Sequence, residues 1–174
     1  MLPRPLAGDH APFYQGYVDC VPDGDVLAQL AAQRERMLAL LARASEADGE
    51  RRYAPGKWSV KRVVQHLADG ERVFSYRALC FARGEQQALP GFDENLFAER
   101  DGSERRSLAT IAAEFAAVRT ATLALFAGFD AAAWQRRGIA NGQPIAVRAL
   151  PWITLGHELH HVAMLHERYG LARP

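Results

Sequence analysis

The chain has 174 residues, of which 49% are hydrophobic and 24% charged, and its formal net charge is +1 with neutral histidines. This length predicts a single domain over residues 1–174, long enough to bury a core. The balanced charge argues against nucleic acid or an anionic membrane surface as a partner. Two cysteines are too few for a disulfide framework, and the N-terminal segment has no apolar run long enough for a signal peptide. We therefore expect a cytoplasmic globular protein.

The first half of the chain predicts an arm followed by two helices. Prolines punctuate residues 1–24, which we expect to form an extended arm. Apolar residues then recur at helical spacing and predict a helix that ends near Ala47-Asp48-Gly49. Ser59 is a good N-cap for a second helix, which Gly84 ends. The following residues 85–102 predict a long connection with one short helical turn.

The second half predicts two further helices separated by a hairpin. Ser107 caps a third helix that frays around Gly128, with a short extra turn as far as Trp134. In 138–147 two β-prone pieces flank Asn141-Gly142, a dipeptide typical of a tight hairpin turn. A fourth helix runs from about 148 to 169. Four amphipathic helices with little else predict an all-α four-helix bundle, and the long links after the second and third helices allow crossovers.

A metal site is suggested by the segment HELHH, residues 157–161. On a helix His157 and His161 lie about 40° apart, so that their imidazoles can reach one cation. Their face is otherwise apolar, and buried ring nitrogens need a partner. His66 lies at the edge of the buried face of the second helix. Three inward histidines from two helices predict a three-histidine metal site with open coordination positions.

HELHH also matches the H-E-x-x-H signature of zinc peptidases, but the surrounding residues argue against a peptidase. The extended form of that signature requires glycine and histidine where this chain has Met164 and Glu167. Few residues follow His161, and no sheet is predicted that could align a peptide substrate.

Three carboxylates close to these histidines have two interpretations each. Glu158 lies about 80° from the midpoint of the histidine pair, where it could approach a bound water or face another helix in an ion pair. Asp69 could accept a hydrogen bond from an imidazole and orient it. Glu71 is expected to pair with an arginine. We take Glu158 and Asp69 as the candidates for handling protons, and a solvated carboxylate remains the alternative for Asp69 and Glu71.

Three segments together resemble the DinB-like superfamily: APGKWSVKRVVQHLADGERVFSYRALCFARG, then LPGFDEN, and finally LGHELHHVAMLHERYG. The superfamily includes DNA-damage-inducible proteins and thiol-dependent transferases related to mycothiol maleylpyruvate isomerase and bacillithiol transferase. The resemblance spans about Tyr14 to Tyr169. It implies an up-down-down-up four-helix bundle, often dimeric, that binds a divalent zinc, nickel, iron or manganese ion through His66, His157 and His161.

Two functions remain open, and a stress-response interaction protein with a vestigial metal site is a third possibility. The first is an enzyme whose metal activates water or a low-molecular-weight thiol for attack on a small molecule, as a hydrolase or thiol transferase. Arg62 and Arg77 could then hold an anionic substrate group, although single arginines on a helix are more often solvated. Cys80 lies roughly 20 Å along the helix from His66, too far to act as the thiol. The second is a non-catalytic stress-response module that a metal braces, for which a fourth protein ligand such as His160 or Glu158 is expected.

Overall fold

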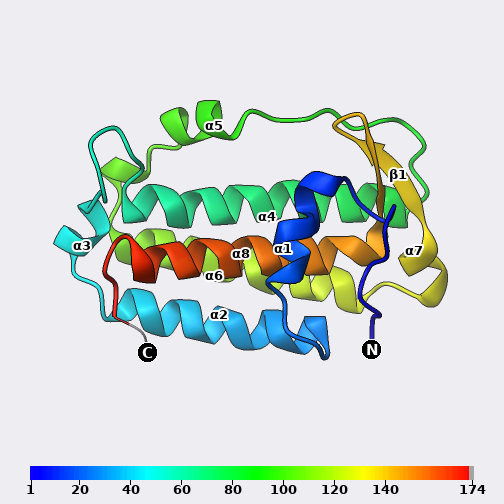
Figure 1. Ribbon diagram of the computed structural model, residues 1–174, viewed down its shortest axis with the longest axis horizontal. Coiled ribbons are helices and arrows are strands. Elements are labelled where there is room, and N and C mark those ends of the chain that lie inside the picture. Colours follow the sequence, from blue (N-terminus) through cyan, green and yellow to red (C-terminus); the bar gives the residue numbers. More distant parts are fainter. Residues whose placement is uncertain (173–174) are drawn as a thin grey trace.

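A computed structural model describes residues 1–172 and contains four long helices packed as a bundle (Figure 1). They are α2 (Val26–Ala42), α4 (Val60–Ala82), α6 (Leu108–Ala127) and α8 (Leu150–Glu167). Both α2 and α4 pack against α6 and α8. In Figure 1, α2 and α8 run in one direction and α4 and α6 in the other. The predicted four-helix bundle and its up-down-down-up order are therefore confirmed.

Because α4 and α6 are parallel, the chain between them must return along the length of the bundle. Residues 83–107 do so and contain α5 (Glu94–Arg100) and the 3-10 turn η2 (Ser103–Arg105) (Figure 1). This is the long connection with a short helical turn that the sequence predicts. The serine caps are also confirmed, since Ser59 accepts from the backbone N–H of Arg62 and Ser107 from that of Thr110.

The connection from α6 to α8 contains the predicted hairpin. After α7 (Ala131–Gln135), strand β1 (Arg137–Ala140) pairs antiparallel with β2 (Gln143–Ala146), and the 3-10 turn η3 (Val147–Ala149) leads into α8. Asn141 and Gly142 both have positive φ, 52° and 70°, as the turn of a two-residue hairpin requires. The hairpin also pairs with Leu89 of the first connection. Helix α8 begins two residues later than predicted and ends two residues earlier.

The predicted end of the first helix is wrong. Helix α2 ends at Ala42, and a separate helix α3 (Glu46–Glu50) follows. Ser45 and Asp48 form a capping box, in which each side chain bonds the backbone N–H of the other residue. This motif starts a new helix at a point where apolar spacing alone indicates continuation.

The N-terminal arm is not wholly extended as predicted. It contains the 3-10 turn η1 (Pro12–Tyr14) and helix α1 (Gln15–Asp19), which lies across α8 (Figure 1). A Cβ at Gly156 of α8 would lie 1.9 Å from the backbone oxygen of Tyr17, so glycine is needed for this close approach. An isolated five-residue helix is not stable in water, which is why tertiary packing, and not local sequence, creates α1.

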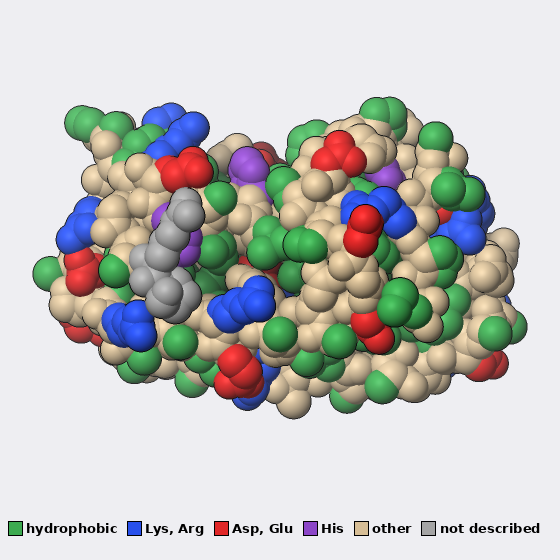
Figure 2. All heavy atoms as spheres, turned by 60° about the horizontal axis from the view of Figure 1, so that its bottom comes forward, with side chains coloured by type: hydrophobic (Ala, Val, Ile, Leu, Met, Phe, Trp, Pro, Cys, Tyr) green, Lys and Arg blue, Asp and Glu red, His purple; other side chains and the backbone are tan. Residues whose placement is uncertain are grey.

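Helix α6 is long and apolar enough to span a membrane by length and composition. In this fold it packs against α2 and α4, and Ile111, Phe115 and Phe126 are among its buried side chains. On the face of the molecule that Figure 2 shows, acidic and basic side chains are interspersed. That mixture agrees with the balanced charge of the sequence.

Candidate metal centre

The fold brings together the three histidines that the sequence selects. His66 lies in the second turn of α4, and His157 and His161 lie on successive turns of α8. The ring of His66 has its centroid 4.9 Å from that of His157 and 5.0 Å from that of His161, and the latter two are 4.7 Å apart. One nitrogen of each ring lies within 4.8 Å of the others. We call these three residues the histidine triad.

The nitrogen atoms of the triad have the spacing that a divalent cation requires. The Nε2 atoms of His66 and His157 are 2.9 Å apart. Two nitrogens bound to one zinc at ~2.1 Å would lie about 3 to 3.4 Å apart, so little movement is needed. Nδ1 of His161 is buried and has no hydrogen-bond partner among residues 1–172. These residues therefore fit a metal.

Burial also keeps the triad neutral, the form in which imidazole ligates. Desolvation lowers the pKa of His66 to about 4. It lowers the pKa of His161 to about 3, with smaller contributions from the charges of His66 and His160. The pKa of His157 is also well below its usual value, chiefly because of desolvation.

Aromatic side chains and a glycine hold the rings in place. Trp58 packs on His66 with ring centroids 4.9 Å apart, while Tyr17 of α1 and Phe74 of α4 pack on His157 at 5.2 and 5.8 Å. A Cβ at Gly70 would lie 3.1 Å from Cε1 of His157, tighter than ordinary contact. Glycine at this position therefore lets the α8 imidazole rest against α4.

Two cavities reach the triad. The first, of about 300 Å³, touches His66 and His157, and the second, of about 270 Å³, touches His161. The first is walled mainly by aromatic residues from the arm, α4 and the chain before α5, with the hairpin at its edge. Its lining includes Phe13, Tyr14, Tyr17, Phe74, Phe92 and Arg77. Small molecules thus have space beside the imidazoles.

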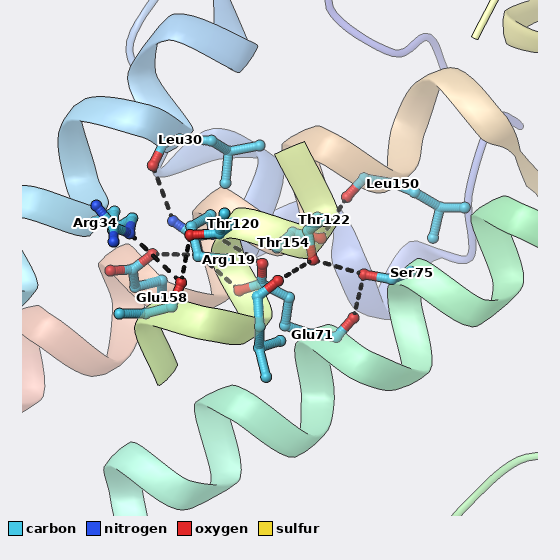
Figure 3. Close-up of polar contacts among 12 residues, drawn as sticks. Leu30, Arg34, Glu71, Ser75, Arg119, Thr120, Thr122, Leu150, Thr154 and Glu158 are labelled. Atoms are coloured by element: carbon cyan, nitrogen blue, oxygen red, sulfur yellow. Dashed lines mark hydrogen bonds and ion pairs between the residues drawn. The ribbon is translucent and has the colours of Figure 1, made fainter. Parts of the chain in front are cut away.

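Glu158 takes the second of the two roles open to it, the ion pair. Its Oε2 accepts from Arg119 of α6 at 2.7 Å, and Arg119 also binds both oxygens of Glu71 at 2.8 Å (Figure 3). Arg119 also donates to the backbone oxygen of Leu30, its third partner. All three charged side chains are at most 3% exposed. We call them the Arg119 cluster; because Glu158 belongs to it, we do not assign Glu158 to proton handling.

Asp69 does not have the predicted role of orienting an imidazole. Its carboxylate accepts from Gln65 at 3.2 Å and from Arg72 at 3.0 Å, and no histidine of residues 1–172 bonds to it. Asp69 instead lies on the side of α4 that faces α5, where its side chain and Phe97 line a surface hollow. The expected pairing of Glu71 with an arginine is confirmed.

The other histidines near the triad are held elsewhere. His160 is exposed and packs on the ring of Tyr17, with centroids 5.5 Å apart. His166 bonds through Nδ1 to the backbone oxygen of Leu171. Among residues 1–172, the triad is the only group of three or more histidine, cysteine or carboxylate side chains close enough to share an ion.

A family model described as the DinB superfamily matches residues 29–165. This chain belongs to the DinB superfamily. Among solved structures, it is similar to YfiT from Bacillus subtilis, described as a probable metal-dependent hydrolase with an unusual four-helix bundle topology. The two share 17% identity and a TM-score of 0.72, over 98% of this chain and 95% of YfiT. At this identity the likeness shows a shared fold. No curated protein sequence matches the chain.

Within this DinB fold the two candidate anion-binding arginines differ. Arg62 lies near Asp101 and Glu104 and pairs with them at 3.9 and 3.3 Å. Arg77 is 2% exposed and lines the first cavity. The solvated interpretation therefore does not hold for Arg77, which alone of the two faces the space beside the triad.

Arg119 and Tyr17 were not predicted from the sequence. Arg119 could have been found, since it falls on the same helical stripe as the buried Ile111, Phe115 and Phe126. A charge on such a stripe requires buried partners. Tyr17 had no comparable signal, because its place beside His157 depends on α1 docking onto α8.

Proposed function

We propose that this DinB superfamily protein is a metal-dependent enzyme of the hydrolase type. Its divalent cation would be bound by the histidine triad, and its substrate would be a small molecule in the adjoining cavity. One observation carries the proposal: three buried, neutral imidazoles converge beside a cavity, with no fourth protein ligand among residues 1–172. Three protein ligands and an open position are typical of catalytic metal sites.

A divalent cation held by neutral imidazoles keeps its full charge and supplies an activated water or thiol at neutral pH. The chain's own residues do the rest. The triad fixes the cation's position, while Trp58, Phe74 and Tyr17 exclude bulk water from the imidazole faces. A dry environment strengthens electrostatic interactions with a developing negative charge.

The bracing function is less well supported. A purely structural ion is expected to be saturated by protein ligands. The two residues considered for a fourth ligand are engaged elsewhere, His160 with Tyr17 and Glu158 with Arg119. The description of YfiT as a probable metal-dependent hydrolase favours water over a thiol as the nucleophile. Thiol transfer, a cytoplasmic location and a homodimer remain predictions from the resemblance and composition.

The proposal can be tested by incubating the metal-loaded protein with esters, amides and alkylating electrophiles, with and without a low-molecular-weight thiol. We expect turnover that is lost on chelation and in His157→Ala, and retained in the matched variant His160→Ala. Turnover without thiol would indicate a hydrolase, and strict dependence on thiol a transferase. Stoichiometric metal without turnover in either condition would contradict an enzymatic role.

A further inference from the structure

The two fully buried arginines of the described chain have very different surroundings. Arg119 is bound by two carboxylates and a backbone oxygen. Arg77 has only neutral partners, the hydroxyl of Tyr14 at 3.2 Å and the backbone oxygen of Pro90 at 3.4 Å. No Asp or Glu among residues 1–172 forms an ion pair with it. A buried charge without a counter-ion is costly, so Arg77 would be stabilised by an anion bound in the cavity that it lines.

Arg77 lines the same cavity as His66 and His157 of the histidine triad, which indicates where an anion would bind. His66, Gly70, Phe74 and Arg77 all line the first cavity. Arg77 follows His66 by eleven positions, about three turns, so the two residues share one face of α4 with Cα atoms roughly 16 Å apart. Helical side chains lean toward the N-terminus, which brings the guanidinium back toward His66. The cavity therefore has Arg77 at one end and the triad at the other.

The walls between these ends are largely aromatic, with the amides of Asn141 and Gln143 at the hairpin edge. Tyr14, Tyr17, Phe74 and Phe92 line them, and the cavity volume is about 300 Å³. At ~30 Å³ per water, this is the volume of roughly ten water molecules, which suits a compact organic molecule of similar heavy-atom count. The exposed carboxylate of Glu94 also lines the cavity and disfavours ligands with more than one negative charge.

From these features, and on the basis of the proposed function, we propose the substrate class. It is a small organic monocarboxylate with an aromatic or similarly flat apolar body and its reactive group at the far end. Arg77 binds the carboxylate, for which the planar guanidinium has matching paired donors. The aromatic walls hold the body, and the reactive group lies beside His66 and His157. Arg77 is thus a specificity-determining residue.

Binding of matched probes to the zinc-loaded protein tests this proposal by calorimetry. We compare phenylpropanoate with its neutral isostere phenylpropanamide and with propanoate. We expect phenylpropanoate to bind about tenfold or more tightly than either, since the amide lacks the charge and propanoate lacks the aromatic body. Equal affinity of the acid and the amide, or no binding of either, would overturn the proposal.

The variant Arg77→Met removes the charge but keeps much of the apolar stem. It should lose the preference for the acid over the amide and keep stoichiometric zinc. The matched variant Arg62→Met, on the same helix but paired with Glu104, should keep the preference. Because Arg77 lacks a counter-ion, ligand-free Arg77→Met should have a melting temperature no lower than that of the ligand-free wild type. Adding phenylpropanoate should raise the melting temperature of the wild type but not that of Arg77→Met. An unchanged preference in Arg77→Met would contradict the assignment.

A second variant covers the case in which Arg77→Met does not fold. Arg77→Lys keeps the charge but not the paired donors, and it should reduce the preference for the acid severalfold. The readouts also separate the two proposals. Acid binding that depends on Arg77 in a protein that takes up no zinc would refute the metal function and leave the carboxylate site standing. Stoichiometric zinc binding without a preference for the acid would refute the carboxylate site and leave the metal function standing.

Discussion

Two buried polar clusters share helices α4 and α8 but differ in charge and in their access to cavities. In the Arg119 cluster the charges are paired within the protein and sealed in the core (Figure 3). In the histidine triad the rings face one another beside two cavities, and Nδ1 of His161 has no partner in the described chain. His157 and Glu158 are adjacent in sequence yet belong to different clusters. Oppositely charged groups that pair with one another join helices, whereas neutral imidazoles that converge beside cavities can bind a ligand.

The largest expected difference between the two clusters is the loss of bound metal when a histidine of the triad is truncated. His66→Ala, His157→Ala and His161→Ala should each abolish stoichiometric binding of a divalent ion, because two imidazoles alone hold it weakly. Elemental analysis of the purified variants measures this. His166→Ala is the control and should retain the ion, since its ring bonds to Leu171. Retention of metal by His66→Ala would show that His66, the residue from α4, is not a ligand.

In the Arg119 cluster the corresponding effect should fall on stability. Arg119→Met would leave Glu71 and Glu158 buried without their cation, and we expect a loss of about 3–5 kcal/mol in the free energy of unfolding. Urea denaturation at neutral pH measures it. Arg34→Met is the control; its partner Glu35 is largely exposed, so a loss of about 1 kcal/mol or less is expected. Equal losses in the two variants would contradict a structural role for the cluster.

The metal-free triad should make stability depend on pH. An unfolded histidine takes up a proton below pH ~6.5, but the pKa of folded His66 is about 4. As pH falls from about 6.5 to about 4, histidine in the unfolded state binds protons that it does not bind in the folded state, so the free energy of unfolding decreases. Above about pH 7 this effect is absent. Urea midpoints in a chelator should fall over that range. The His66→Gln/His161→Gln double variant should show a flatter profile, and identical profiles would refute the explanation.

The smallest effect should come from Gly70. Gly70→Ala adds a Cβ 3.1 Å from Cε1 of His157, which must shift by a few tenths of an ångström. We expect metal affinity to fall by about tenfold or less, as for residues that orient ligands, while apo stability changes by no more than about 1 kcal/mol. Competition titrations with a chromogenic chelator measure the affinity. In Gly16→Ala the added Cβ meets nothing within 4 Å, so unchanged affinity is expected there.

Much of the fold and the triad could be predicted because helical periodicity is local. It places His157 and His161 on one face, and it places His66 at the edge of a buried stripe. The serine caps and the Asn-Gly turn are likewise local signals, and the structure has them where they were predicted.

The roles of Glu158 and Asp69 could not be predicted in the same way. An azimuth of about 80° from the histidine pair is compatible with either the cation or a neighbouring helix. Which one applies to Glu158 depends on α6 placing Arg119 beside it. The same dependence on packing explains the misassigned role of Asp69 and the unpredicted helix α1.

The central claim is that three imidazoles from α4 and α8 hold one divalent cation and leave part of its coordination open. Anomalous X-ray scattering from crystals of the zinc-loaded protein tests it most directly. We expect one zinc at about 2.1 Å from a nitrogen of each of His66, His157 and His161, with solvent in the remaining positions. Zinc bound elsewhere, or a fourth protein ligand completing the shell, would contradict it.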